Sequence, residues 1–400
     1  MIQIAVFGYG TVGSGVVEVI EENKEVVNKK SLSQLNVKYI LDLRSFPGDP
    51  YESKVVHDVE VILNDPEIKI ICETMGGLKP AYDFTKRALE KGISVCTSNK
   101  ELVAAHGPEL ISIAKDHGCN YMFEASVGGG IPIIRPLNSS LTAEKIDGIT
   151  GILNGTTNYI LTKMEREGSK FEDVLKEAQE KGYAERNPEA DIEGYDAGRK
   201  IAILTSLMTG KNMPYEKVYT EGISKITAVD FNYMKKMDST IKLFGLSREV
   251  DGKYYAMVAP FVVGCEHPMS MVNDVFNAIF VHGNMLGDSM YYGKGAGKLP
   301  TASAVVADVI DCARHIGKNI SVFWDAEDVD VISVDEVKHK FFVRVPLSDK
   351  DKVSASFGVS CFIEGVEEGE CGFVTDLISE KGFASKTAGL NVISRIRVVE

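Results

Sequence analysis

The sequence predicts an α/β fold built from a doubly wound parallel sheet, an α+β domain and a small C-terminal α+β module. Three observations predict it. Short apolar runs alternate with helical patterns through the first 130 residues, as a parallel sheet with helical crossovers requires. A glycine-rich turn, GYGTVG, directly follows the first apolar run. Beyond Gly128, strands and helices follow one another without strict alternation, which is typical of α+β architecture.

Residues 1–130 carry the elements of the parallel sheet, and we expect a helix at 301–317 to complete this domain at about 300–320. The strands are predicted from apolar runs, and helical periodicity fills the intervals. The predicted strands are 2–7, 37–41, 68–74, 93–98 and 119–125, and the predicted helices are 12–27, 81–91 and 108–116.

Residues 131–300 are expected to form a second domain, and residues 336–400 a third. Pro132 is well placed as the first residue of a helix, because an N–H group has no helical partner there. In the second domain, strands are predicted at 145–153, 253–263 and 271–283, and helices at 156–167, 171–181 and 197–208. In the third, strands are predicted at 340–347, near 359–364, near 371–377 and at 391–400, with one helix between the last two.

The chain is acidic: 44 Lys+Arg against 57 Asp+Glu give a formal net charge of −13. This balance disfavours nucleic acid and anionic membrane surfaces as partners, because both need clustered cations. No uncharged apolar run approaches the ~18–20 residues that span a bilayer, and the N-terminus lacks the basic start of a signal peptide. The seven cysteines form no C-x-x-C pair, which indicates reduced thiols in a cytoplasmic protein and excludes a metal–thiolate site.

The turn from Gly8 to Gly13 lies between the first predicted strand and the first predicted helix. Gly8 permits the tight turn, Gly10 lets the backbone approach a pyrophosphate, and Gly13 allows the helix to pack closely on the strand. The N–H groups at the start of the helix that begins at Val12 would bind the phosphates. In this context the turn predicts a Rossmann-type dinucleotide-binding domain; a tight turn without a ligand is the alternative.

The choice of cofactor depends on Asp42 and Arg44, at the end of the second strand. An acidic residue there accepts the ribose hydroxyls of NAD, whereas an arginine pairs with the 2′-phosphate of NADP. A solvated loop residue is the alternative for Arg44. The sequence therefore leaves NADP or NAD open and slightly favours NADP.

Two lysines are candidates for catalysis. Lys100, in CTSNK, follows a strand at the edge where doubly wound sheets bind ligands; an ordinary surface lysine is the alternative. Lys200 follows Asp196 by four residues on one helix face, after a loop that also carries Glu185 and Asp191. These carboxylates suit an ammonium group, and the lysine suits proton delivery to an alkoxide. Such a pair is more often a surface salt bridge.

A fourth motif, EASVGGGIP at 124–132, offers one carboxylate and several backbone carbonyls. Oxygen ligands of this kind suit a hard cation. A hinge between domains is the alternative and is favoured from the residues alone.

Together these motifs resemble the homoserine dehydrogenase family over roughly residues 1–320. The shared segments, in the family's order, are GYGTVG, ETMGG, TSNK, EASVGGGIP, GILNGTTNYIL, the stretch at 182–200 and YYGKGAGKLPTASAVVAD. The resemblance implies reversible NAD(P)-dependent interconversion of L-homoserine and L-aspartate 4-semialdehyde, in threonine and methionine biosynthesis. It also implies a homodimer or homotetramer, with residues 131–300 binding substrate and joining subunits.

By position, the resemblance implies roles for individual residues. Lys200 is similar to the family's lysine that protonates the aldehyde oxygen, with Lys100 and Asp196 assisting it. The implied substrate-binding residues are Glu185, Asp191, Asp196 and Lys100. The implied cofactor-binding residues are Gly8, Gly10, Thr11, Val12, Gly13, Arg44, Thr74, Ser98, Lys100, Gly182 and Gly297. Glu124, with the carbonyls of Val127, Gly129 and Ile131, is similar to a structural sodium site.

The chain departs from the family pattern in two places. Lys294 stands in GKGAG where the family has a proline, which affects loop rigidity. The C-terminal part resembles an ACT regulatory domain in FFVRV and ISRIRVVE, but SDKDKVSASF lacks the Pro-Gly that shapes the ligand loop. Similarity of fold is therefore favoured over threonine sensing.

Two other functions stay open on the residues alone. The first is a dehydrogenase of another oxo-acid or semialdehyde acting through a cysteine thioester, for which Cys96 is the candidate. The second is a non-enzymatic dinucleotide-sensing regulator, which would keep the glycine turn but would not need the cluster of acids and lysine.

Overall fold

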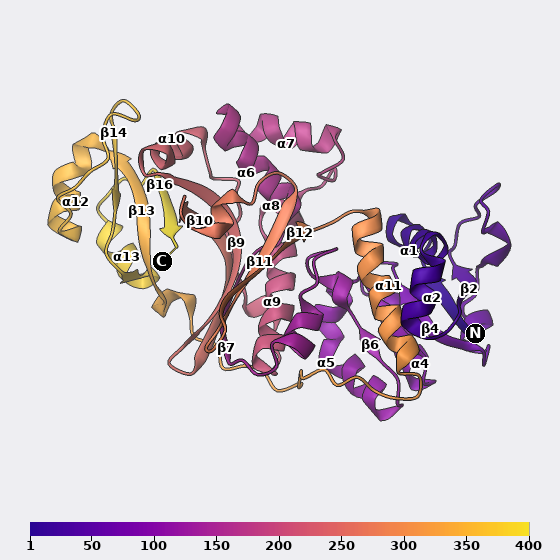
Figure 1. Cartoon of the computed structure of the whole chain (residues 1–400). Helices are drawn as coiled ribbons and strands as arrows, with labels where there is room; N and C mark the ends of the chain where they lie inside the picture. Colours follow the sequence, from indigo (N-terminus) through magenta and orange to yellow (C-terminus); the bar gives the residue numbers. More distant parts are fainter. Residues whose placement is uncertain (400) are drawn as a thin grey trace. The chain divides into compact units, whose positions relative to one another are not determined.

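A computed structural model of the chain describes residues 1–399 and divides into two compact units (Figure 1). The first unit comprises residues 1–145, 202–215 and 291–329; the second comprises residues 146–201, 216–290 and 330 to the C-terminus. The predicted three-part division at 130, 300 and 336 stays a prediction. Among the described helices, none has the length and apolar character that a membrane-crossing segment requires.

The first unit contains a six-stranded parallel sheet in the order β3-β2-β1-β4-β5-β6. This is the strand order of a doubly wound dinucleotide-binding sheet, so the predicted fold class is confirmed for this part. Helices on both faces explain why the strands are continuous apolar runs. The strands are β1 Ile2–Phe7, β2 Leu35–Leu41, β3 Val55–Val56, β4 Ile68–Glu73, β5 Ser94–Thr97 and β6 Tyr121–Met122.

The helices of the first unit enclose one apolar core. Val16 of α1 and Val305 and Val309 of α11 belong to the same buried cluster as Ile4 of β1. The late helix α11 thus packs on the N-terminal sheet, as the sequence predicts. The helices are α1 Thr11–Glu22, α2 Lys24–Ser31, α3 Val59–Leu63, α4 Ala81–Glu90, α5 Lys100–Asp116 and α11 Lys298–Arg314.

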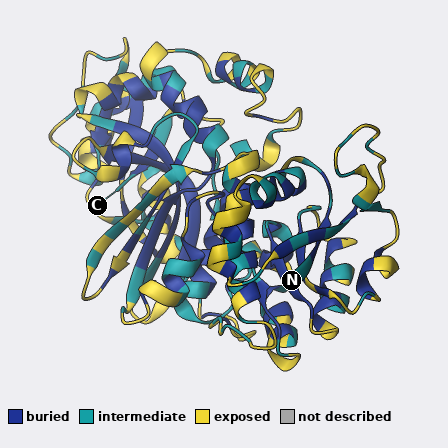
Figure 2. Ribbon diagram, turned by 45° about the vertical axis from the view of Figure 1, so that its right-hand side comes forward, coloured by how far each residue is buried: buried dark blue, intermediate teal, exposed yellow. Residues whose placement is uncertain are grey.

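A ten-stranded mixed sheet, with the main path β12-β11-β7-β9-β10-β16-β13-β14, dominates the second unit. Its central strands β9 and β10 pair antiparallel along their whole length and are largely buried (Figure 2). Its first strands are β7 Ile146–Ile152, β8 Tyr219–Thr220, β9 Ser239–Val250, β10 Lys253–Gly264, β11 Phe276–Gly283 and β12 Gly287–Lys294. The helices are α6 Gly155–Glu167, α7 Phe171–Glu180, α8 Glu189–Ile192, α9 Tyr195–Thr209 and α10 Ala228–Lys236. Helix α9 continues into the first unit.

The C-terminal elements extend this second sheet. They are β13 Lys338–Pro346, α12 Lys350–Phe357, β14 Glu370–Val374, β15 Ile378–Ser379, α13 Glu380–Thr387 and β16 Ser394–Val398. Strand β13 lies between β14 and β16 and is antiparallel to both, which suits a β-α-β-β-α-β module. Strand β16 also pairs in parallel with β10, so the module and the rest of the unit share one sheet. Its ACT-like character stays a prediction.

The structure corrects several predicted boundaries. The helix predicted to start at Pro108 begins at Lys100, because Asn99 caps it through the N–H of Leu102, and Pro108 lies inside it. Helical residues after the glycine loop begin at Ile134 and not at Pro132. The strand predicted at 271–283 begins at Phe276, after a 3-10 turn at Pro268–Met271. The strand predicted at 119–125 shortens to β6, and the one near 359–364 to a single bridge at Ile363.

Candidate active site

The glycine turn joins β1 to α1 in the first unit. A Cβ at Gly13 would lie 1.9 Å from the carbonyl oxygen of Gly8, so only glycine allows the helix this close. A Cβ at Gly10 would touch nothing within 4 Å, and Gly10 caps α1 without a side-chain hydrogen bond. The first N–H groups of α1 are thus not capped by the side chain of the N-cap residue, as anion binding at a helix N-terminus requires. Thr74 fixes the turn by donating to the carbonyls of Phe7 (2.9 Å) and Gly8 (3.0 Å).

A cavity of about 500 Å³ opens beside this turn. Four predicted cofactor residues line it, namely Gly8, Gly10, Arg44 and Thr74. Its remaining lining residues are Leu41, Asp42, Leu43, His57, Val59, Met75, Gly76, Pro80 and Phe84. Most of the other predicted cofactor residues also lie in the first unit: α1 contains Thr11, Val12 and Gly13, Ser98 and Lys100 follow β5, and Gly297 caps α11. Gly182 is exposed and belongs to the second unit.

Asp42 and Arg44 form an ion pair in this cavity. Arg44 Nη2 lies 2.9 Å from Asp42 Oδ2, and Arg44 Nε lies 3.0 Å from Asp42 Oδ1. The Arg44 hydrogen bonds hold the pKa of the Asp42 carboxyl well below its usual range, with a further contribution from the backbone N–H of Tyr9. Arg44 is 63 % exposed and Asp42 only 9 %. The guanidinium is therefore the more accessible group.

Glu73, which the sequence analysis did not single out, joins the loops that follow β4 and β5. Its buried carboxylate accepts a hydrogen bond from the N–H of Met75 (2.8 Å) and one from Thr97 Oγ1 (2.5 Å). Burial raises the pKa of this carboxyl, against the effect of its hydrogen bonds. Asn99 adds a second link by donating to the carbonyl of Gly77 (2.6 Å). Only the acidic end of the apolar run IKIICE signals such a residue in the sequence.

Lys100 is the first residue of α5, beyond the carboxyl end of β5. It is partly exposed. Its place at the ligand-binding edge of the parallel sheet matches the prediction. It belongs to the first unit, whereas Glu185, Asp191, Asp196 and Lys200 belong to the second.

The acid–lysine cluster of the second unit is buried. Lys200 is 9 % exposed and Asp196 6 %, and Lys200 Nζ donates to Asp196 Oδ2 (2.6 Å) and to the carbonyl of Leu153 (2.7 Å). Asn154 Nδ2 donates to both Asp191 Oδ1 (2.7 Å) and Asp196 Oδ2 (2.9 Å). The alternative of a solvated surface salt bridge is therefore wrong for Asp196–Lys200. The exposed side chain of Glu185 makes no hydrogen bond or ion pair within residues 1–399.

Asn154 is the residue that the sequence analysis missed in this cluster. It follows β7 by two residues and caps α6, accepting from the N–H of Thr157 at 2.9 Å. One amide therefore fixes a helix start and holds two carboxylates together. The signal was present in GILNGTTNYIL, where an asparagine precedes a helix, but sequence gives no distance between Asn154 and the loop at 191–196.

The Glu124 carboxylate caps the following segment. It accepts from the N–H groups of Ile133 (2.6 Å), Ile134 (2.9 Å) and Arg135 (2.7 Å), so its oxygens are already engaged. Val127, Gly129 and Ile131 are buried residues of the loop that follows Glu124. No group of three or more His, Cys, Asp or Glu side chains in residues 1–399 is arranged to hold a metal ion.

The cysteine alternative is not supported by the structure. Cys96 is fully buried, and burial raises its pKa well above the usual range, with a further contribution from Cys312 at 3.6 Å. A nucleophilic thiol needs the opposite, a stabilised thiolate with access to substrate. This group cannot form the thioester.

Two family models match the chain. One, described as homoserine dehydrogenase, matches residues 132–310, and the other, described as the NAD binding domain of homoserine dehydrogenase, matches residues 8–124. The homoserine dehydrogenase of Bacillus subtilis is 35 % identical over 419 aligned positions, covering 100 % of this chain and 97 % of the relative. That of Synechocystis sp. is 43 % identical over 318 positions, covering 78 % and 73 %.

Solved structures give the same result. A homoserine dehydrogenase from Thiobacillus denitrificans matches with a TM-score of 0.90 at 33 % identity, covering 100 % of this chain and 98 % of that one. A hyperthermophilic archaeal homoserine dehydrogenase in complex with NADPH matches with a TM-score of 0.67 at 29 % identity, covering 78 % and 97 %. With the parallel sheet, the glycine turn and the buried acid–lysine cluster, these matches show that the chain belongs to the homoserine dehydrogenase family of NAD(P)-dependent oxidoreductases.

Proposed function

We propose that Lys200 is the proton donor and acceptor in the interconversion of L-homoserine and L-aspartate 4-semialdehyde. The observation that carries this proposal is its buried position on Asp196 and the carbonyl of Leu153. These two acceptors take two of the three N–H donors of an ammonium group, which leaves the third for the substrate oxygen. When bound, the nicotinamide cofactor supplies or accepts the hydride. Lys200 stabilises the negative charge that reduction leaves on the aldehyde oxygen and protonates it.

Asp191 and Asp196 bind the ammonium group of the amino-acid substrate in this proposal. Two carboxylates that share one amide donor, Asn154 Nδ2, face a common point. An ammonium group placed there gains charge-assisted hydrogen bonds. Glu185 joins them only if its loop changes conformation, since its side chain is exposed.

The cofactor in this proposal is NADP in preference to NAD. The exposed Arg44 guanidinium lines the cavity beside the glycine turn and is the group suited to a 2′-phosphate. Asp42, held under Arg44, would bind ribose hydroxyls if Arg44 turned away. Lys100, at the start of α5, holds the substrate oxygen beside the nicotinamide.

A sodium ion on the carbonyls of Val127, Gly129 and Ile131 belongs to the same proposal. Backbone carbonyl oxygens of buried residues such as these are the kind of ligand that a hard cation takes. Glu124 contributes by shaping the loop, because its carboxylate is engaged by N–H groups. Replacing sodium by choline at constant ionic strength should lower the melting temperature. An unchanged melting temperature would rule out the proposed sodium site.

We also propose a cytoplasmic homo-oligomer, a dimer or a tetramer. All seven cysteines are unpaired, which suits a reducing compartment. Large exposed apolar side chains gather on the β11–β12 hairpin and its turn, as at a subunit interface; they are Met285, Leu286, Met290 and Tyr292. Sedimentation equilibrium measures the mass of the assembly, and a monomer would overturn the proposed oligomer. Cell fractionation identifies the compartment, and a protein found outside the cytoplasm would overturn the proposed location.

Lys200→Met tests the central assignment, because it keeps the length of the side chain and removes the charge. We expect kcat for homoserine oxidation to fall by roughly 10²–10⁴-fold, the range of general acid–base catalysis, while the Kd for NADP+ stays unchanged. Lys163→Met is the matched control, since Lys163 pairs with Glu167 on the surface of α6. Activity near the wild-type value in Lys200→Met would end the proposal.

A further inference from the structure

The C-terminal strand carries two arginines into the second sheet. Strand β16 pairs in parallel with β10, with Arg397 opposite Phe261. Arg397 is only 1 % exposed. Its Nε donates to Glu380 Oε1 (2.6 Å), and Arg395 Nη1 donates to Glu380 Oε2 (2.9 Å). Both guanidinium groups are thereby fixed on the first residue of α13.

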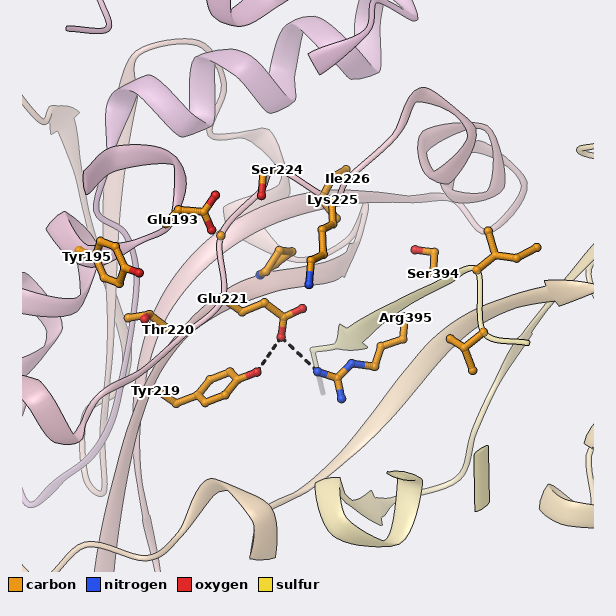
Figure 3. Close-up of a pocket in the computed structure, with 14 residues that line it drawn as sticks. Glu193, Tyr195, Tyr219, Thr220, Glu221, Ser224, Lys225, Ile226, Ser394 and Arg395 are labelled. Carbon is orange, nitrogen blue, oxygen red and sulfur yellow. Dashed lines mark hydrogen bonds and ion pairs between the residues drawn. The ribbon is translucent and has the colours of Figure 1, made fainter. Parts of the chain in front are cut away.

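Both arginines also bind Glu221, which comes directly after β8. Arg397 Nη1 lies 2.8 Å from Glu221 Oε2. Arg395 Nη2 lies 3.3 Å from the same oxygen, which also accepts from the Tyr219 hydroxyl at 3.0 Å (Figure 3). Burial acts to raise the pKa of the Glu221 carboxyl, but Arg397 and Arg395 outweigh it and hold the pKa below its usual value. Glu221 is therefore an anion that the C-terminal strand holds in place.

The residues after Glu221 touch the loop that carries the substrate carboxylates. The N–H of Ile223 donates to the carbonyl of Ile192 at 2.9 Å. A Cβ at Gly222 would lie 2.2 Å from that same carbonyl oxygen and 2.6 Å from Glu193 Cα. Backbone therefore packs on backbone without space between them. Ile192 and Glu193 lie between Asp191 and Asp196, so Gly222 packs on the segment that joins the two carboxylates.

A cavity of about 420 Å³ separates this loop from the C-terminal strand. Glu193 and Tyr195 line it on one side, and Ser394 and Arg395 on the other (Figure 3). Across this open space, Glu221 and its neighbours connect the strand to the loop. The anchoring of Glu221 thus has a direct path to the loop.

We propose that Glu221, held by Arg395 and Arg397, is a positioning residue for the substrate: it sets the loop at 191–196 through Gly222 and Ile223. This proposal rests on the assignment of Asp191 and Asp196 to the substrate ammonium group. It makes the C-terminal strand part of the homoserine site, whatever the C-terminal module itself binds. In this proposal Glu221 acts through the loop and not on the reacting atoms, so it affects homoserine affinity and not proton transfer.

Glu221→Gln tests this, because it keeps the shape of the side chain and removes its charge. We expect KM for homoserine to rise roughly three- to thirty-fold, the range of coupling through a packed network, with KM for NADP+ unchanged. Glu370→Gln is the matched control. Glu370 is also the second carboxylate of a buried arginine, Arg344, and its side chain is 20 % exposed against 24 % for Glu221. The control should lower the melting temperature without changing KM for homoserine.

Gly222→Ala tests the same path without touching an ion pair. Its new methyl group must displace the carbonyl of Ile192, so KM for homoserine should again rise while KM for NADP+ stays constant. This variant also keeps the proposal testable if Glu221→Gln does not fold. An unchanged KM for homoserine in Gly222→Ala, or an equal rise in Glu370→Gln, would overturn the positioning role. Those outcomes leave the Lys200→Met result unaffected, so failure here is distinct from failure of the proposed catalytic lysine.

Discussion

Lys200 and Asp196 show how burial changes the meaning of a short sequence spacing. Exposed pairs at i and i+4 contribute about 0.3–0.5 kcal/mol, whereas this pair lies under the loop that Asn154 holds and is almost inaccessible. The spacing was visible in the sequence; the burial was not. Asn154 and Glu73 were missed for the same reason, since each acts through partners distant in sequence: 37 residues to Asp191 and 24 to Thr97.

Arg44 carries a prediction about cofactor choice. Arg44→Ala removes the cation that suits a 2′-phosphate and leaves the Asp42 carboxylate without its ion pair. The remaining negative charge then repels the phosphate. We expect kcat/KM for NADP+ to fall roughly ten- to a hundred-fold, as for loss of a hydrogen bond to a charged group, with a smaller change for NAD+. The measurement is steady-state kinetics with both cofactors.

Arg87→Ala is the control for this variant, because Arg87 forms an exposed ion pair with Glu60 in the same unit. It should change neither cofactor's kcat/KM. An unchanged NADP+/NAD+ ratio in Arg44→Ala would contradict the preference for NADP.

At the scale of elements, the sequence predicted the parallel sheet well and the mixed sheet less well. The strand at Ile2–Phe7 was predicted to the residue, because parallel strands buried on both faces are continuous apolar runs. Strand β9, Ser239–Val250, was not predicted, although it is the centre of the second sheet. Its run STIKLFGLSREV contains a glycine and three charged residues. Lys242 is tolerated there because it donates to the carbonyl of Val272 (2.8 Å) and to Asn273 Oδ1 (2.9 Å).

Strand β13 carries a prediction about pH. Burial lowers the pKa of His339 to about 4, from 6.5, with a further contribution from Arg397. Because the folded-state pKa lies below the unfolded-state value, the unfolded chain binds more protons between pH 6.5 and 4. Stability is therefore full above pH 6.5 and decreases as pH falls through this range, by about 3 kcal/mol in all.

His339→Phe should flatten this dependence, since a phenyl ring suits the aromatic neighbours Tyr255, Phe261 and Phe341 and does not titrate. The measurement is the melting temperature from pH 7.5 to 4.5. His117→Phe, at an exposed position, should leave the wild-type profile in place. Equal profiles for wild type and His339→Phe would show that another group causes the acid sensitivity.

For the whole molecule, the residues proposed for the reaction are divided between two compact units. The first holds the glycine turn, the cavity with Arg44, and Lys100; the second holds Asn154, Asp191, Asp196 and Lys200. Not all of the 57 acidic side chains are solvated surface charges, because Glu221, Asp230 and Glu380 are bound to buried arginines. Composition predicted the excess of acid, but it could not distinguish these structural anions from solvated ones.

The most direct test of this account is the oxidation of L-homoserine by the full-length chain, measured as cofactor reduction with NADP+ and NAD+ in parallel. The account predicts turnover that depends on homoserine, with a higher kcat/KM for NADP+ than for NAD+. Absence of homoserine-dependent turnover with both cofactors, in a folded sample that binds NADP+, would contradict it.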